Sequence, residues 1–146
     1  MKKAILLPII AIAFLLSSCN NRYVAEENCS ELDFFKNGYK ALVTKDYKQG
    51  IQNFTKVLEL NPEDPEAFAY RGLCKYYLED YEGAIDDYTS AIGIQPNYAE
   101  AYDLRGIAKG EIGDKGGACE DWKMAFQFGF NDAYNLINEF CMEEDE

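Results

Sequence analysis

Five cysteines are the residues of this 146-residue sequence best suited to chemistry, at positions 19, 29, 74, 119 and 141. No two of them form a Cys-x-x-Cys pair, which argues against a thioredoxin-like motif and a ribbon-type zinc site. The sequence contains no histidine, so Ser-His-Asp and Cys-His catalysis and His-containing metal sites are excluded. We predict no catalytic residue, no metal ligand and no cofactor, and so not an enzyme.

Adjacent acidic residues at 86–87, 120–121 and 143–145 are the other group that could suggest chemistry, either calcium binding or glycoside hydrolysis. Neighbouring side chains on a helix point about 100° apart, so adjacent carboxylates do not converge on one ion or one bond. No EF-hand spacing is present. We interpret these pairs as solvent-exposed helix faces.

The charge balance limits the class of partner. Fourteen basic and 26 acidic residues give a net charge of −12, which argues against nucleic acid as a ligand. Hydrophobic residues make up 48% of the chain, enough to bury a core. A charged partner is therefore expected to be basic.

The segment 1–18 has the form of a signal peptide, with Lys2 and Lys3 before an apolar run at 4–16 that is too short to span a bilayer. The next residues, Leu16-Ser17-Ser18-Cys19, resemble a bacterial lipobox. The resemblance implies cleavage before Cys19 and lipid attachment to Cys19, with more than one acyl chain, palmitate among them. A plain secretory signal with an incidental Cys19 is the alternative.

Cleavage would leave residues 19–146, and loss of two lysines with no acid would move the net charge from −12 to −14. We interpret 19–30 as the lipidated cysteine and a polar tether. Asn20 is not the aspartate that retains such proteins at the inner membrane of enteric bacteria, so the outer membrane is favoured. The sequence does not distinguish its periplasmic from its surface-exposed side.

An internal repeat organises the remainder of the chain, which aligns with itself at an offset of 34 positions. Its aligned columns include Gly38/Gly72/Gly106, Asp46/Asp80/Asp114, Phe54/Tyr88/Trp122 and Pro62/Pro96. Each repeat contains two amphipathic stripes of helical period, and the second starts at the aspartate, whose carboxylate can cap free N–H groups. In the first two repeats it ends before the proline, whereas the third has Phe130 at that position, just after Gly129.

The period and these columns resemble the tetratricopeptide repeat. The resemblance implies a right-handed all-α solenoid of three helix-turn-helix units at 31–64, 65–98 and 99–132. Residues 133–146 would form a capping helix and an acidic tail, with Leu136, Ile137, Phe140 and Cys141 on one face. In the third repeat, Gly116 and Gly117 lie at the start of the second helix, so we expect this helix start to be the least stable of the three.

Four cysteines remain beside Cys19, and they allow three pairings. Cys119 on the last repeat and Cys141 on the cap are the favoured partners, since a bridge there would join the cap to the array. The alternative, that all four cysteines are small buried apolar residues, has equal weight.

The resemblance also implies a concave groove lined by the first helices. A second stripe on those helices is predicted to face away from the core, with an aromatic first half and an acidic far end that includes Glu100 and Glu111. The candidate groove residues are Phe35, Tyr39, Tyr70, Leu73, Tyr76, Asp103 and Ile107. Filling of inter-helix space by these aromatics is the competing interpretation.

One subgroup of the family clamps a C-terminal carboxylate with Lys, Asn and Arg. This chain has other residues at the matching places, namely Phe35, Tyr39, Leu73, Asp103 and Leu104, so that ligand is not expected. We predict a scaffold of the cell envelope that binds a protein or peptide partner. The alternatives are a subunit that positions an envelope enzyme or assembly machine, and a carbohydrate or peptidoglycan binder.

Overall fold

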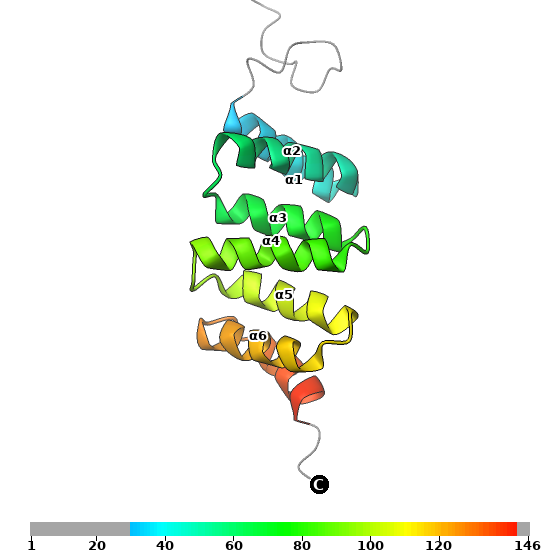
Figure 1. Ribbon diagram of the computed structural model, residues 1–146, viewed down its shortest axis with the longest axis vertical. Coiled ribbons are helices and arrows are strands. Elements are labelled where there is room, and N and C mark those ends of the chain that lie inside the picture. Colours follow the sequence, from blue (N-terminus) through cyan, green and yellow to red (C-terminus); the bar gives the residue numbers. More distant parts are fainter. Residues whose placement is uncertain (1–29, 143–146) are drawn as a thin grey trace, which may run out of the picture.

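The computed structural model describes residues 30–142, which form a stack of helix pairs without a β-strand (Figure 1). The predicted signal peptide, Cys19, the tether up to residue 29 and the acidic tail lie outside the described residues. The all-α prediction is confirmed. The helices are α1 Glu31–Val43, α2 Tyr47–Leu60, α3 Pro65–Tyr76, α4 Tyr81–Ile94, α5 Ala99–Glu111, α6 Lys115–Gln127 and α7 Ala133–Leu136, followed by the π-helix η2 Ile137–Cys141.

Acidic side chains start the second helix of every pair. Asp46, Asp80 and Asp114 each accept a hydrogen bond from the backbone N–H three residues later, at 3.2, 3.1 and 2.9 Å. These bonds satisfy donors that have no partner inside the helix. Ser30, which we had assigned to the tether, forms a capping box with Asp33 and so belongs to the start of α1.

The two helices of each pair meet where a glycine faces an aromatic ring. A Cβ added to Gly38 would lie 2.9 Å from the Phe54 ring, and the equivalent distances at the next two repeats are 2.8 and 2.7 Å. Any larger residue would have to displace the ring. This close approach explains why glycine recurs at the same place in the first helix of every repeat.

Buried ion clusters also join the two helices of the second and third pairs. Both Nε and Nη2 of Arg71 on α3 donate to Asp87 on α4, at 3.0 and 2.7 Å, and Lys75 lies 2.8 Å from the same carboxylate. The arrangement recurs in the third pair with Arg105, Lys109 and Asp121.

Asp87 and Asp121 are only 3% exposed. Our interpretation of 86–87 and 120–121 as fully solvated pairs was therefore wrong for one member of each. Asp86 and Glu120 are exposed, as expected. The angle of about 100° between adjacent side chains sends one carboxylate to solvent and the other to the arginine of the neighbouring helix.

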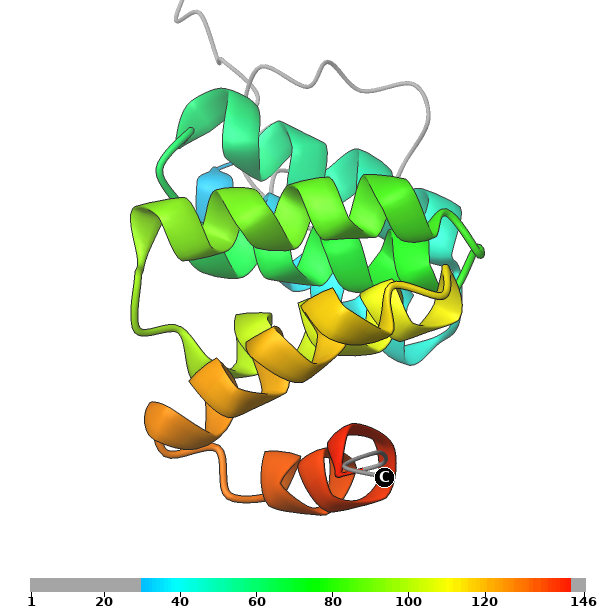
Figure 2. The same cartoon turned by 60° about the horizontal axis from the view of Figure 1, so that its bottom comes forward.

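The chain ends in a cap, which we define as α7 and η2 together; Figure 2 shows it beyond α6. Leu136, Ile137 and Cys141 pack on the cluster that contains Trp122. The predicted capping helix begins as an α-helix and continues in η2, which has the wider turn of a π-helix. Phe140 is 50% exposed, and its ring is tilted against the Trp122 ring at a centroid distance of 5.8 Å.

Candidate partner-binding surface

Three aromatic side chains from α1 and α3 form an accessible cluster, which we call the aromatic patch: Phe35, Tyr39 and Tyr70. The Tyr70 ring lies 5.7 Å from each of the other two, edge to face in both cases. Beneath them, the buried ring of Phe54 stacks on Tyr70 at 5.6 Å. Tyr39 remains 49% exposed. The patch is therefore an aromatic surface that packs on the buried Phe54 ring, and the ring of Tyr39 at its edge is half-exposed.

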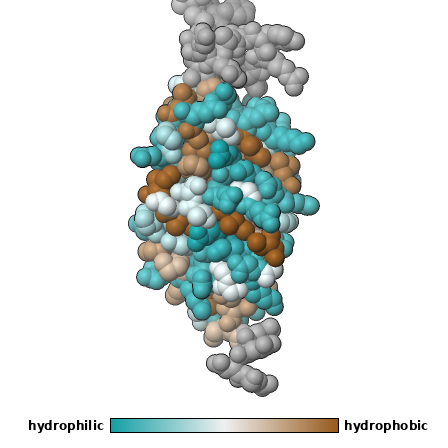
Figure 3. Space-filling model, viewed as in Figure 1, coloured by the Kyte–Doolittle hydropathy of each residue, from teal (hydrophilic) through white to brown (hydrophobic). Residues whose placement is uncertain are grey.

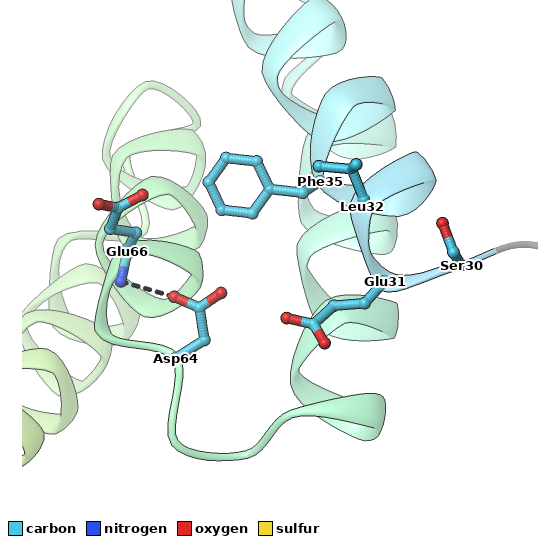
Figure 4. Close-up of a pocket in the computed structure, with 6 residues that line it drawn as sticks. All are labelled: Ser30, Glu31, Leu32, Phe35, Asp64 and Glu66. Carbon is cyan, nitrogen blue, oxygen red and sulfur yellow. Dashed lines mark hydrogen bonds between the residues drawn. The ribbon is translucent and has the colours of Figure 1, made fainter.

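A hollow of about 570 Å³ lies beside the patch, between the first turns of α1 and α3 (Figure 4). Phe35 and Leu32 provide its apolar wall, and we call it the acidic hollow because three carboxylates complete it. Its lining is Ser30, Glu31, Leu32, Phe35, Asp64 and Glu66. Of these, only Phe35 was predicted from the sequence.

Two of the three carboxylates also have structural partners. Glu31 accepts a hydrogen bond from Asn61 Nδ2 at 3.1 Å, and Asp64 caps α3 by accepting from two backbone N–H groups. The carboxylates come from two helix starts and the connecting loop, so no helical period relates them. The position of Asp64 directly before Pro65, typical of a helix N-cap, was the signal that could have located that carboxylate.

Nearby tyrosines show the electrostatic character of this region. Burial raises the pKa of Tyr98 to about 12, and the negative charges of Glu66, Glu100 and Asp64 contribute further. Burial also raises the pKa of Tyr70, again with a contribution from Glu66. The local potential is thus negative, and it favours a cation over an anion.

Two further groove candidates are partly buried. Tyr76 packs on the cluster formed by Ala84, Tyr88 and Ala108, and its hydroxyl donates to Glu111 Oε1 at 3.1 Å. Burial and this bond raise the pKa of Tyr76 to about 12. Leu73, one helical turn before the end of α3, is half-buried. Tyr76 therefore ties α3 to α5 in this structure.

The acidic far end of the predicted stripe is open only in part. Asp103 is 7% exposed, and Ile107 packs with the cap against the Trp122 cluster. The prediction that this stripe faces away from the core is corrected at Asp103. Ala69, at the same position of the second repeat, is buried as well, in a cluster with Ala91 and Ala101. Glu100 and Glu111 stay exposed.

The cysteines in the described part have two distinct environments. Cys119 and Cys141 form a disulfide, with 5.7 Å between their Cα atoms. Cys74 is free and fully buried, and burial raises its pKa to about 11, so its thiol is unreactive near neutral pH.

Within residues 30–142, no three acidic or cysteine side chains are grouped so that they could hold a metal ion. No helix in the same range is long and apolar enough to cross a membrane. On the face shown in Figure 3, hydrophobic residues form several patches between hydrophilic ones.

Solved structures identify the architecture. The first TPR of Spaghetti (RPAP3), bound to the HSP90 peptide SRMEEVD, matches with a TM-score of 0.74 and 21% identity over 83% of this chain and 96% of that one. This chain has the tetratricopeptide repeat (TPR) fold. The TPR2B domain of yeast Sti1, in complex with pHsp70, matches at a TM-score of 0.73 and 18% identity, covering 78% and 98% of the two chains.

The Sgt2 TPR domain of Aspergillus fumigatus matches at a TM-score of 0.69 and 24% identity, over 73% of this chain and 72% of that one. No protein-family model and no curated protein matches the sequence. The TPR helix pairs of this chain are α1–α2, α3–α4 and α5–α6, and the cap follows the third pair.

Proposed function

We propose that this TPR chain is a non-catalytic scaffold that binds a protein or peptide segment across the aromatic patch and the acidic hollow. The observation that carries the proposal is the half-exposed Tyr39 ring on a rigid aromatic support, beside a hollow that can accept a side chain. Rigid aromatic anchors next to a pocket are typical of binding hot spots.

We infer that the ligand combines apolar anchors with a basic residue. The neighbour RPAP3 was solved with the acidic peptide SRMEEVD. Here the hollow is lined by carboxylates instead, and the arginines of α3 and α5 are occupied by Asp87 and Asp121. A cationic side chain fits the hollow better than an acidic one, because it neutralises repelling carboxylates.

We propose further that the scaffold is held at the cell envelope, most simply the outer membrane, by lipid on Cys19. The support is the lipobox-like sequence before Cys19 and the apolar run that precedes it. Metabolic labelling with an alkyne fatty acid should mark the wild-type chain and leave Cys19→Ser unlabelled. Equal labelling of both would refute the anchor and leave the binding surface untouched.

Site-specific photo-crosslinking in native membranes tests the binding surface. A crosslinker in place of Tyr39 should trap one discrete protein, whereas the same group in place of Tyr134, which is 53% exposed on α7, should not. With the trapped partner purified, Tyr39→Ala should weaken binding about tenfold or more, equivalent to about 1.4 kcal/mol. Tyr134→Ala is the matched control.

The charge of the hollow is tested separately. Glu66→Gln should reduce the association rate and its dependence on salt, whereas Glu82→Gln on α4 should change neither. Equal effects of the two glutamate variants, or unchanged binding by Tyr39→Ala, would refute this assignment of the surface.

A further inference from the structure

The cap packs on α6, and Ile107 of α5 joins the same cluster, at a position equivalent to the exposed Tyr39 on α1. Phe35 and Asp103 occupy equivalent repeat positions, as do Tyr39 and Ile107. Phe35 and Tyr39 line the accessible surface, whereas Asp103 is buried and Ile107 packs against the cluster that contains cap residues. In the third unit, the end of the chain thus packs beside Ile107 of α5.

The carboxylate of Asp103 is buried in this arrangement, and no cation or hydrogen-bond donor of the described residues compensates the Oδ1 atom. Asp103 Oδ1 is buried and accepts no hydrogen bond from residues 30–142. Arg105 and Lys109 of the same helix are directed to Asp121 on α6, and the charge that acts on Asp103 is that of Asp132, just before the cap. Burying an unpaired carboxylate near another negative charge opposes closure.

A disulfide bond opposes the electrostatic repulsion that would otherwise favour opening of the cap. Cys141, the last residue of η2, is bonded to Cys119 on α6. The non-covalent contacts of the cap come chiefly from Ala133 and from the partly buried Leu136 and Ile137, while Tyr134 and Phe140 are half-exposed. A cap with so few buried side chains depends strongly on its cross-link.

We propose that the Cys119–Cys141 disulfide is the latch of a cover over the third unit, and that its reduction releases the cap and exposes Asp103 and Ile107. The reductant is a dithiol: its two thiols become a disulfide, and two electrons and two protons convert the cystine to the Cys119 and Cys141 thiols. The consequence for ligand binding rests on the proposed function, since the exposed acid would extend the surface toward a second cationic residue.

Trp122, the single tryptophan, provides the readout, because it lies in the cluster under the cap. Dithiothreitol at pH 7.5 should shift Trp122 emission to longer wavelength and increase acrylamide quenching at least twofold in the full chain. Amide exchange in 133–141 should accelerate at least tenfold, while the protected amides of α1–α4 stay unchanged. The variant C119S/C141S should behave like the reduced protein and show no further response to dithiothreitol.

Two controls complete the test. Cys29→Ser must retain the response, which excludes an effect of that cysteine. In the reduced protein, Asp103→Asn should slow exchange in 133–141 by at least threefold, because it removes the charge that opposes closure. Unchanged emission and exchange after reduction would overturn the latch, as would loss of protection throughout α1–α6, which would make the disulfide a staple of the whole fold. None of these readouts requires a partner, so failure of the latch and failure of the binding surface are distinguishable.

Discussion

The first TPR unit and the two that follow use the same ring-on-glycine packing but different polar contacts. In the second and third units, an arginine, a lysine and a buried aspartate join the two helices. The first unit has Asn37, Ala41 and Asn53 at the equivalent positions. Asn53 is buried and donates to the Gln49 carbonyl of its own helix at 2.9 Å.

The packing of an aromatic ring on a glycine is thus common to all three described units, whereas the buried ion clusters occur only in the second and third. Each arginine also reaches the preceding unit: Arg71 Nη1 lies 3.4 Å from Thr55 Oγ1, and Arg105 Nη1 lies 3.1 Å from Thr89 Oγ1. The ion clusters therefore connect three helices, and they set the register between units as well as within them. The neutral contact at Asn53 lies within one helix.

The largest difference between the units should appear when the buried acid is removed. Asp87→Ala leaves Arg71 and Lys75 largely buried without their counter-charge, so we expect a loss of about 3–5 kcal/mol in the free energy of unfolding. Asn53→Ala removes one neutral hydrogen bond and should cost about 1 kcal/mol. Urea denaturation at pH 7 measures both.

A neutral copy of the first unit provides the control. The triple variant R71N/K75A/D87N leaves no charge unpaired, and it should lose less stability than Asp87→Ala alone. A larger loss in the triple variant, or equal losses for Asp87→Ala and Asn53→Ala, would show that the clusters stabilise by something other than charge compensation.

The second prediction contrasts the two buried acids of the third unit, Asp121 with two cations and Asp103 with none. Burial raises the pKa of Asp103 from 3.8 to about 6. Because the folded pKa lies above the unfolded one, ionisation of Asp103 opposes folding. Its cost is present above about pH 6 and is lost as the pH falls toward 4.

Asp103→Asn should therefore raise stability at pH 7 by about 2 kcal/mol and bring it closer to the wild type at pH 4.5. Denaturation at several pH values measures the difference between the two proteins. A difference that does not change between pH 7 and pH 4.5 would contradict a titrating Asp103.

The smallest predicted effect is the loss of a helix cap, and it should be the same in all three units. Asp46, Asp80 and Asp114 make the same capping bond, so each change to alanine should cost about 1 kcal/mol. Thermal unfolding of the three single variants measures this. A markedly larger loss for Asp114→Ala would indicate that Gly116 and Gly117 make the start of α6 especially dependent on its cap.

Much of the helical framework could be predicted because its causes are local or periodic. Asp80 precedes a helix start, Pro96 follows a helix end, and Gly72 and Tyr88 recur with the repeat. The Arg71–Asp87 pair was also periodic, since both residues recur at the equivalent places of the third unit. The adjacent acids by themselves do not indicate this pair, because the partner of Asp87 lies 16 residues away on the neighbouring helix.

The candidate surface was predictable only in part. Phe35 and Tyr39 follow the helical period of the predicted stripe, Tyr70 lies beside that stripe, and the structure brings the three together. No sequence period indicates the carboxylates of the hollow, which are Glu31, Asp64 and Glu66. They meet only because the fold places two helix starts and a loop side by side.

The sequence by itself determined the repeat, the helix limits, the aromatic and glycine columns, and the excess of acid over base, because each depends on residue type and spacing along one chain. Tertiary structure decided which of those residues are reachable. At one and the same repeat position, Asp103 and Ala69 are buried, whereas Phe35 lines the open hollow although α3 packs beside it. Burial is a property of neighbours in space, and so is the environment that raises the pKa of Asp103.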